Sequence, residues 1–435
     1  MRHAFCLALL FGVVSAADAP VIDPALAPLI AKLGDDDFDT RETAEKAIIA
    51  RAREHEEAFT PMLSSLLAGE RDPEIRGRIE KLIAKISVVG SLDWSVEAGQ
   101  IYQLPAISNN RIYIGNKDGT LLCYDITKGT KLWTHENGGP IYKSLAVEDG
   151  RVIAIRVRKE GRPDGRVFAF DALDGHELWS WQDDIKSQNF TAPIIANGSV
   201  FLGRASELIC LDALQGEKRW SIKTENALSA PPSVSDGRMV IEQFGGALQC
   251  ISANDGKILW ALQLESHSQA GACMNGERCF VAGGVAVYCV DVTTGVKKWE
   301  SSGLENVGVP LAVKGNRVLA AHSQTLRCLS AEDGREMWSR ELGGHIYAQP
   351  ALVGNRVYVG ALNTKLTMYC LDAATGETLW THVTTEGGYA EPIIVGRRLF
   401  VGYHSKFYCL KTGMPGPASW PMSGGNPGRS GCNDH

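Results

Sequence analysis

A unit of about 40 residues recurs from about residue 90 onward and constrains the fold more than any other feature of the chain. Each unit contains a short apolar strand, a turn rich in Asn, Asp and Gly, a second strand, a third strand ending in Asp or Ser, and a fourth strand with a tryptophan. Such turns between β-branched runs are typical of antiparallel hairpins. A repeat of this length predicts a propeller or a solenoid. The tryptophans that mark it are Trp94, Trp133, Trp179, Trp220, Trp260, Trp299, Trp338, Trp380 and Trp420.

Four antiparallel strands per unit make a blade, and blades that close into a ring hide their sheet edges. The chain has eight sets of three inner strands but nine tryptophan strands. The last unit, which ends in Trp420, lacks the Asp and is spaced differently, so we assign the Trp94 strand to the eighth blade as its outer strand. The sequence therefore predicts a mainly-β, eight-bladed propeller over residues 90–413, followed by a C-terminal tail over 414–435.

The turn between the third and fourth strands has its own pattern, in which a Gly follows an Asp after three residues. The Asp side chain can accept backbone N–H groups, and Gly can adopt the left-handed conformation. The flat face of each tryptophan can pack on the neighbouring blade. So many similar copies favour a structural role over catalysis. Besides the tryptophans, the residues concerned are Asp125, Asp171, Asp212, Asp291, Asp372, Gly129, Gly175, Gly216, Gly256, Gly295, Gly334 and Gly376.

The motif, written here as CYDITKGTKLW or CLDAATGETLW, resembles the repeat of the pyrroloquinoline quinone (PQQ)-like propellers. Two classes share that architecture: quinoprotein dehydrogenases, and non-enzymatic scaffolds that resemble the periplasmic propeller of the outer-membrane β-barrel assembly machinery. The resemblance implies that a dehydrogenase would carry adjacent cysteines and a tryptophan at the cofactor, with Glu, Asn and Asp around calcium. This chain has no Cys-Cys pair, and Trp181 is its one tryptophan outside the repeat. We therefore expect a scaffold without a cofactor, with PQQ and calcium disfavoured; a PQQ- or sugar-linked oxidoreductase is the alternative.

The residues before the repeat predict a targeting segment and a small helical module. Residues 1–17 have the basic start, apolar run and small residues of a secretory signal peptide, so we expect an exported protein, periplasmic or extracellular. Residues 20–88 predict helices, with Asp39 and Glu42 as a capping box and Asp72 starting the last helix. This module resembles a HEAT-like repeat, and the sequence leaves open whether it binds a partner or caps the propeller.

Net charge argues against some classes of partner, and the placement of the cysteines predicts their redox state. A net charge of −6 gives no reason to expect nucleic acid, and no segment is apolar for the 18–20 residues or so that span a membrane. Seven of the eleven cysteines occupy one place in successive units, which predicts buried free thiols. A disulfide between Cys273 and Cys279 is left open. We expect a monomer.

The connections between blades, and those between second and third strands, depart from the repeat and should share one face. Paired glycines and aromatic residues recur there, as does the loop VRKEGRPDG at 157–165, with His322 and His345 on the same side. Clustered Tyr, His, Lys and Glu could bind a protein partner in the cell envelope; the alternative is a solvated rim. No catalytic or metal motif is present. The predicted binding residues are Tyr142, Lys143, Tyr347, Gln349, Tyr389, Glu391 and His404.

Overall fold

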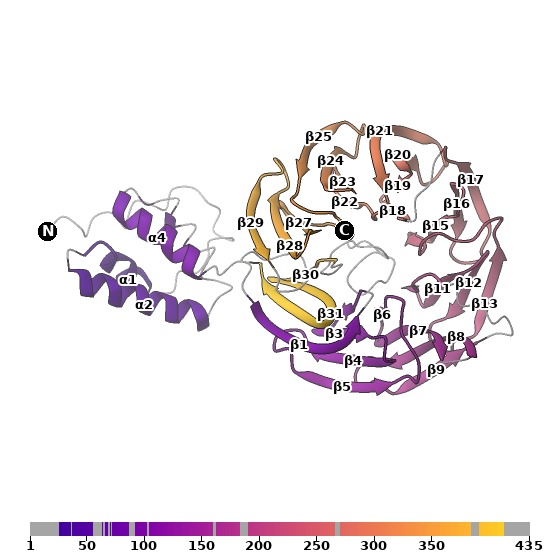
Figure 1. Ribbon diagram of the computed structural model, residues 1–435, viewed down its shortest axis with the longest axis horizontal. Helices are drawn as coiled ribbons and strands as arrows, with labels where there is room; N and C mark the ends of the chain where they lie inside the picture. Colours follow the sequence, from indigo (N-terminus) through magenta and orange to yellow (C-terminus); the bar gives the residue numbers. More distant parts are fainter. Residues whose placement is uncertain are drawn as a thin grey trace. The chain divides into compact units, whose positions relative to one another are not determined.

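The computed structural model describes residues 26–35, 37–54, 63, 66–67, 70, 72–86, 92–101, 104–159, 162–182, 190–265, 270–383 and 391–412. The predicted signal segment and the whole predicted tail, which includes Trp420, lie outside these residues. The chain divides into two compact units, one of residues 1–91 with 411–415 and one of residues 92–410 with 416–435. The helices belong to the first unit and the blades to the second (Figure 1).

The first unit contains helices α1 (Leu26–Lys32), α2 (Phe38–Glu54) and α4 (Pro73–Ile86). Asp72 caps α4, because its Oδ1 accepts the backbone N–H groups of Glu74 and Ile75 at 2.8 and 3.2 Å. The cap of α2 is Asp37, whose Oδ2 accepts the N–H of Thr40 at 2.8 Å. The expected cap, Asp39, lies inside the first turn of that helix. The likeness of this unit to a HEAT repeat stays an expectation.

The apolar side chains of these helices meet in a small core of their own. Ile79 and Leu82 of α4 are fully buried against Ala44 and Ile48 of α2 and Leu33 after α1. Their spacing within α4 places them on one helical face, which is why this face turns inward.

The second unit is an eight-bladed β-propeller of antiparallel sheets, as predicted (Figure 1). Blades 1 to 4 contain β2 (Ala106–Ser108), β3 (Arg111–Gly115), β4 (Thr120–Asp125) and β5 (Lys131–Glu136); β6 (Ala146–Glu148), β7 (Arg151–Lys159), β8 (Arg162–Asp171) and β9 (Glu177–Trp181); β10 (Ile194–Ala196), β11 (Ser199–Arg204), β12 (Glu207–Asp212) and β13 (Lys218–Lys223); and β14 (Ser233–Ser235), β15 (Arg238–Glu242), β16 (Ala247–Ser252) and β17 (Ile258–Gln263).

Blades 5 to 8 continue the same order. They contain β18 (Ala272–Asn275), β19 (Arg278–Ala282), β20 (Gly284–Asp291) and β21 (Lys297–Val307); β22 (Ala312–Lys314), β23 (Arg317–His322), β24 (Thr325–Ser330) and β25 (Glu336–Glu341); β26 (Ala351–Val353), β27 (Arg356–Leu362), β28 (Leu366–Asp372) and β29 (Thr378–Val383); and β30 (Ile393–Val395), β31 (Arg398–Lys411) and β1 (Leu92–Ile101). In blade 8, β31 takes both inner positions, since it pairs with β30 near its start and with β1 near its end.

The ring is closed by the strand that carries Trp94, in agreement with the assignment from the sequence. β1 pairs antiparallel with β31, and Trp94 stands opposite Cys409. An ion pair of 3.0 Å between Arg398 and Asp93 joins the same two strands. The last sheet therefore combines the first and last parts of the propeller sequence, and this pairing leaves no open edge between them.

Each blade presents two different ends, and backbone hydrogen bonds identify them. The turn between the first and second strands meets the turn between the third and fourth, as when Ala213 N–H donates to the Gly198 carbonyl at 3.0 Å. At the other end the loop between the second and third strands meets the connection to the next blade, as when Leu264 N–H donates to Gly246. We call the first end the turn face and the second the loop face.

The repeat residues hold neighbouring blades together. Asp212 Oδ1 accepts the N–H groups of Leu214 and Gln215 at 2.8 and 2.7 Å, which shapes the turn that ends at Gly216. Gly216 has φ +74°, and a Cβ added there would lie 2.5 Å from Trp179 of the preceding blade. The Trp179 indole also donates to the Ala213 carbonyl at 3.1 Å. A tryptophan can pack this closely only on a residue without a side chain.

The cysteines of the described residues are free thiols. Those of the repeat are fully buried opposite the tryptophans, as Cys328 is opposite Trp338. Burial raises the pKa of the Cys328 thiol to about 12. Cys273 pairs with Phe280 while Cys279 pairs with Met274, so the two thiols leave opposite faces of their hairpin. Among the described residues, no helix has the length and apolarity that a membrane crossing requires.

Candidate functional site

Two of the predicted binding residues lie on the loop face of blade 2. Tyr142 and Lys143 follow Ile141, which forms an isolated β-bridge with Arg156. Both side chains are partly buried. Burial lowers the pKa of the Lys143 ammonium group, because removal from water disfavours its charged form.

Two others lie where the chain enters blade 7. His345 is fixed by paired backbone hydrogen bonds with Leu362, and its ring stacks on Tyr347 with centroids 5.7 Å apart. Tyr347 is 51% exposed, which makes it an accessible aromatic group on this face. Gln349 is only 2% exposed, and its Nε2 donates to the Leu311 carbonyl at 2.6 Å. Gln349 therefore links blade 7 to the start of blade 6.

The remaining predicted residues belong to blade 8 or the connection before it. Glu391 is partly buried. His404 pairs through its backbone with Ile101 of β1, but its side chain, like all of Tyr389, lies outside the described residues. The predicted residues that the structure describes thus come from blades 2, 7 and 8 and lie at the same face.

Two buried charged residues on the loop face were not predicted. Arg204, at the end of β11, is 3% exposed, forms an ion pair with Glu207 and lies 5.9 Å from the centre of a Trp181 ring. Glu242, at the end of β15, is 2% exposed and accepts the N–H of Gly271 at 3.2 Å. The signal available in the sequence was a charged residue directly after an apolar second strand, where the chain reaches the loop face.

The turn face has a pocket of about 400 Å³ between blades 2 and 3. Glu148 lies in it, and burial, with a smaller effect of the neighbouring Asp149 carboxylate, raises the pKa of Glu148 to about 7. On the opposite wall Arg219 donates to Asp212 and to Ser199 at 2.7 and 2.6 Å. This pocket therefore holds a carboxyl group that is partly protonated at neutral pH.

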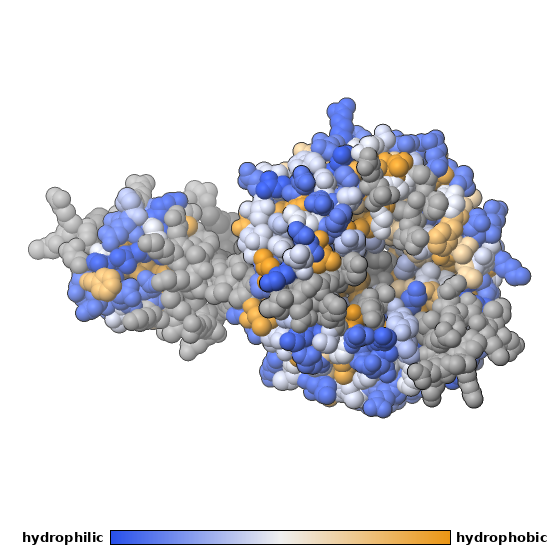
Figure 2. Space-filling view, viewed as in Figure 1, coloured by the Kyte–Doolittle hydropathy of each residue, from blue (hydrophilic) through white to orange (hydrophobic). Residues whose placement is uncertain are grey.

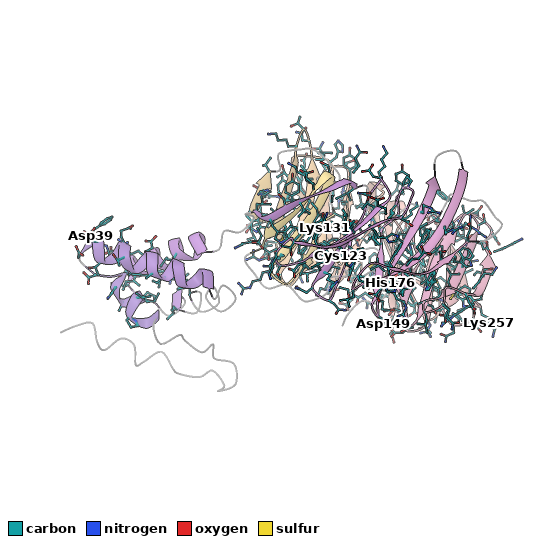
Figure 3. All side chains as sticks on the ribbon, turned by 90° about the horizontal axis from the view of Figure 1, so that it is seen from below. Asp39, Cys123, Lys131, Asp149, His176 and Lys257 are labelled. Carbon is teal, nitrogen blue, oxygen red and sulfur yellow. The ribbon has the colours of Figure 1, made fainter. Side chains whose placement is uncertain are left out.

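Among the residues that the structure describes, none of the candidate groups fits a quinone cofactor with calcium. Trp181, the one tryptophan outside the repeat, packs with Arg204. Within the described residues, the one group of three candidate metal ligands is Asp171, Asp174 and His176, on the turn face of blade 2 (Figure 3). Asp171 is occupied by turn N–H groups there, and His176 lies 2.6 Å from Asp174. These groups shape a turn, and the sequence has no adjacent cysteines.

The visible surface of the propeller is mostly hydrophilic, with scattered hydrophobic residues (Figure 2). Exposed apolar side chains on the loop face include Phe244, 38% exposed, in the loop between β15 and β16, and Val285, 56% exposed, near the start of β20. Together with Tyr347 they are accessible apolar or aromatic side chains on this face.

A ring of eight blades tied by tryptophan–glycine contacts defines a PQQ-like β-propeller. The family model described as outer membrane protein assembly factor BamB matches residues 80–203, 181–288 and 282–412. The chain belongs to this family.

Curated relatives carry the same description. The outer membrane protein assembly factor BamB of Burkholderia pseudomallei is 26% identical over 259 residues, covering 54% of this chain and 64% of that protein. The BamB of Nitrosomonas eutropha is 24% identical over 222 residues, covering 47% and 51%. The chain thus spans between about half and two thirds of the length of these two relatives.

Solved structures show the same fold in both functional classes. BamB from Moraxella catarrhalis has a TM-score of 0.64 at 15% identity and covers 74% of this chain and 100% of that one. Quinohemoprotein alcohol dehydrogenase from Comamonas testosteroni has a TM-score of 0.58 at 14% identity, covering 74% and 76%. Structural likeness at this identity identifies the architecture and does not separate a scaffold from an enzyme.

Proposed function

We propose that the protein is an exported, monomeric and non-catalytic scaffold that binds protein partners in the periplasm or cell envelope during the assembly of outer membrane proteins. The observation that carries this proposal is the family match, which extends over nearly the whole propeller. The name of the family suggests a role in the assembly of outer membrane proteins. The segment at residues 1–17, which resembles a signal peptide, suggests export from the cytoplasm.

The chemistry of the loop face supports binding over catalysis. Its buried charges, Arg204 and Glu242, have partners within the protein. Its accessible side chains include the aromatic Tyr347 and the apolar Phe244 and Val285, and such side chains commonly anchor protein interfaces. We therefore place the partner site on the loop face, with Tyr347 as its accessible aromatic anchor and Tyr142, Lys143 and Glu391 around the same ring of loops.

The proposal is tested by deleting the gene in its host and measuring the amounts of integral outer membrane β-barrel proteins by quantitative mass spectrometry. We expect these proteins to fall while inner membrane proteins stay constant, and a plasmid copy of the wild-type gene to restore them. Unchanged β-barrel proteins after deletion would overturn the proposed process.

The location of the site is tested in the same strain by two matched substitutions. Tyr347→Ala removes an exposed aromatic side chain from the loop face, and Leu214→Ala removes an exposed apolar one, 63% exposed, from the turn face. We expect the Leu214 variant to restore the β-barrel proteins and the Tyr347 variant to restore them less well at equal protein abundance. The reverse order would move the partner site to the turn face.

A further inference from the structure

The strand pair β7–β8 of blade 2 is longer than its counterparts in the other blades. In blade 3 the equivalent pairing ends at the sixth pair, Arg204 with Glu207. In blade 2 the sixth pair is Arg156 with Arg166, and pairing continues to Lys159 with Arg162. The three additional residues of β7 carry the hairpin about 10 Å further on the loop face. Figure 3 shows two long strands in the colour of this segment extending past their neighbours.

This extension is strongly basic. Residues 156–166, which we call the basic hairpin, contain five arginines and lysines and two acidic residues, a net charge of +3 in a chain whose net charge is −6. The cationic residues are Arg156, Arg158, Lys159, Arg162 and Arg166. A local excess of one sign on a projecting element attracts a partner of the opposite sign over roughly the Debye length, about 8 Å at physiological salt.

Two contacts fix the base of the basic hairpin to the blade. The Arg156 guanidinium donates to the Asn137 carbonyl at 2.7 Å and lies 4.9 Å from the centre of the Phe168 ring. Arg166 donates to the Gln182 side chain. The hairpin is therefore presented by an anchored base, and its charge beyond the base can be changed without removing these contacts.

Within the part of the chain that the structure describes, the backbone of the extension has two strand edges without a neighbouring strand. β6 pairs with β7 only as far as Ile153, and β9 pairs with β8 only from Val167 onward. Among the described residues, no strand pairs along 157–159 of β7 or 162–165 of β8 except these two with each other. Open strand edges accept an additional strand, whose main chain supplies affinity and whose side chains supply specificity.

We propose that the basic hairpin docks an acidic, extended segment of a protein partner, which adds as a strand along one of these open edges. The inference deepens the proposed scaffold function and rests on it, because that function calls for a protein partner on the loop face. The sequence of the basic hairpin also includes Glu160 and Asp164. Two negative charges weaken its attraction to a uniformly anionic lipid surface, whereas a partner segment can alternate acidic and neutral residues.

The test uses the full-length mature protein and a fluorescein-labelled decapeptide of alternating threonine and glutamate. In the hairpin variant Arg158→Gln, Lys159→Gln and Arg162→Gln are combined. The control variant combines Lys131→Gln, Lys218→Gln and Lys257→Gln, three exposed lysines on or beside outer strands, two of which are labelled in Figure 3. Both variants lose three positive charges, so a general charge effect would be equal in the two.

Fluorescence anisotropy should show at least tenfold weaker peptide binding for the hairpin variant and less than a twofold change for the control. A peptide of the same charge with alternate N-methylated residues should also bind at least tenfold more weakly, because it cannot pair with a strand edge. Equal loss in both variants, or undiminished binding of the N-methylated peptide, would overturn the proposal.

Two further measurements complete the test. The protein should bind vesicles containing phosphatidylglycerol less tightly than it binds the peptide. If the protein binds these vesicles through the hairpin and does not bind the peptide, the partner is a membrane and the proposal of a protein partner is wrong. Melting followed by circular dichroism should give the same melting temperature for both variants. If the melting temperature of the hairpin variant is lower, the titration is repeated with the single variant Arg158→Gln. If the protein does not bind the peptide but still restores the β-barrel proteins in the deletion strain, the proposed docking site is wrong and the proposed scaffold function is unaffected.

Discussion

Substituting the turn glycine Gly216 by alanine tests whether tryptophan–glycine packing holds the blades together. The added Cβ would lie 2.5 Å from Cδ2 and Cε3 of Trp179, about 1 Å closer than ordinary contact, and the residue has φ +74°. The left-handed conformation costs an alanine about 1 kcal/mol. Overpacking against a fixed indole adds about 1–3 kcal/mol. We expect the free energy of unfolding to fall by about 2–4 kcal/mol.

Gly237→Ala is the matched control, because Gly237 has nearly the same backbone angle, φ +70°, but nothing within 4 Å of an added Cβ. It should lose only the conformational part, about 1 kcal/mol. Urea unfolding followed by tryptophan fluorescence gives both losses from the midpoints, provided that the slopes agree. The difference between the two variants, about 1–3 kcal/mol, measures the steric contact between blades.

A double-mutant cycle separates the contact from other effects at this turn. In a Trp179→Leu background the indole atoms nearest Gly216 are absent, so Gly216→Ala should cost no more than the control. Equal losses for Gly216→Ala and Gly237→Ala in the wild-type background, or an unchanged loss after Trp179→Leu, would refute the reasoning that indole packing requires the glycine.

Four further predictions concern other parts of the propeller. Asp291→Ala removes the acceptor of two turn N–H groups at 2.9 Å and should lower the free energy of unfolding by about 1–2 kcal/mol in urea titrations; no loss would show that the turn forms without its side chain. Because burial raises the Glu148 pKa from 4.5 to about 7, stability from this group is complete below pH 4.5 and is lost as the pH rises through 7. The free energy of unfolding of Glu148→Gln should therefore equal that of the wild type at pH 4 and exceed it at pH 8 by about 1–2 kcal/mol. This difference is reduced from about 3 kcal/mol to allow for solvent screening. Parallel pH profiles of the free energy of unfolding would contradict the prediction. The buried repeat cysteines should not react with iodoacetamide at pH 8 until urea unfolds the chain; they are Cys123, Cys210, Cys250, Cys289, Cys328, Cys370 and Cys409. Peptide mass spectrometry measures the labelling, and labelling of any of them in the native protein would count against their burial. PQQ with calcium should leave the melting temperature unchanged, whereas a saturable increase with a cofactor spectrum would reopen the oxidoreductase alternative.

The ring closure shows how far the repeat pattern alone can go. Trp94 and Trp420 each mark a sequence segment that could form the outer strand of blade 8. The irregular spacing before Trp420 favoured the Trp94 segment for this position. The pairing of β1 with β31 then fixed the register, with Trp94 opposite Cys409. Spacing identifies equivalent positions, but which strand fills the last place depends on hydrogen bonds between residues about 300 positions apart.

The loop face was harder to predict, since its residues do not follow the repeat. The sequence placed Gln349 among accessible binding residues, and the structure places it inside, donating to Leu311 of the neighbouring blade. It gave no prominence to Arg204 and Glu242, which are buried at the ends of second strands. Whether a polar side chain in a blade connection faces water or a neighbouring carbonyl is decided by packing between blades.

The amino-acid sequence by itself determined the blade, the number of blades and the turn chemistry, because these depend on local patterns: strand periodicity, the Asp that accepts nearby N–H groups and the Gly that allows a positive φ. The tertiary structure decided which side chains remain accessible and how far the strand pair of the basic hairpin extends beyond the neighbouring strands. These properties depend on contacts between blades and on how far each paired strand extends, and such contacts join residues that lie far apart in the chain.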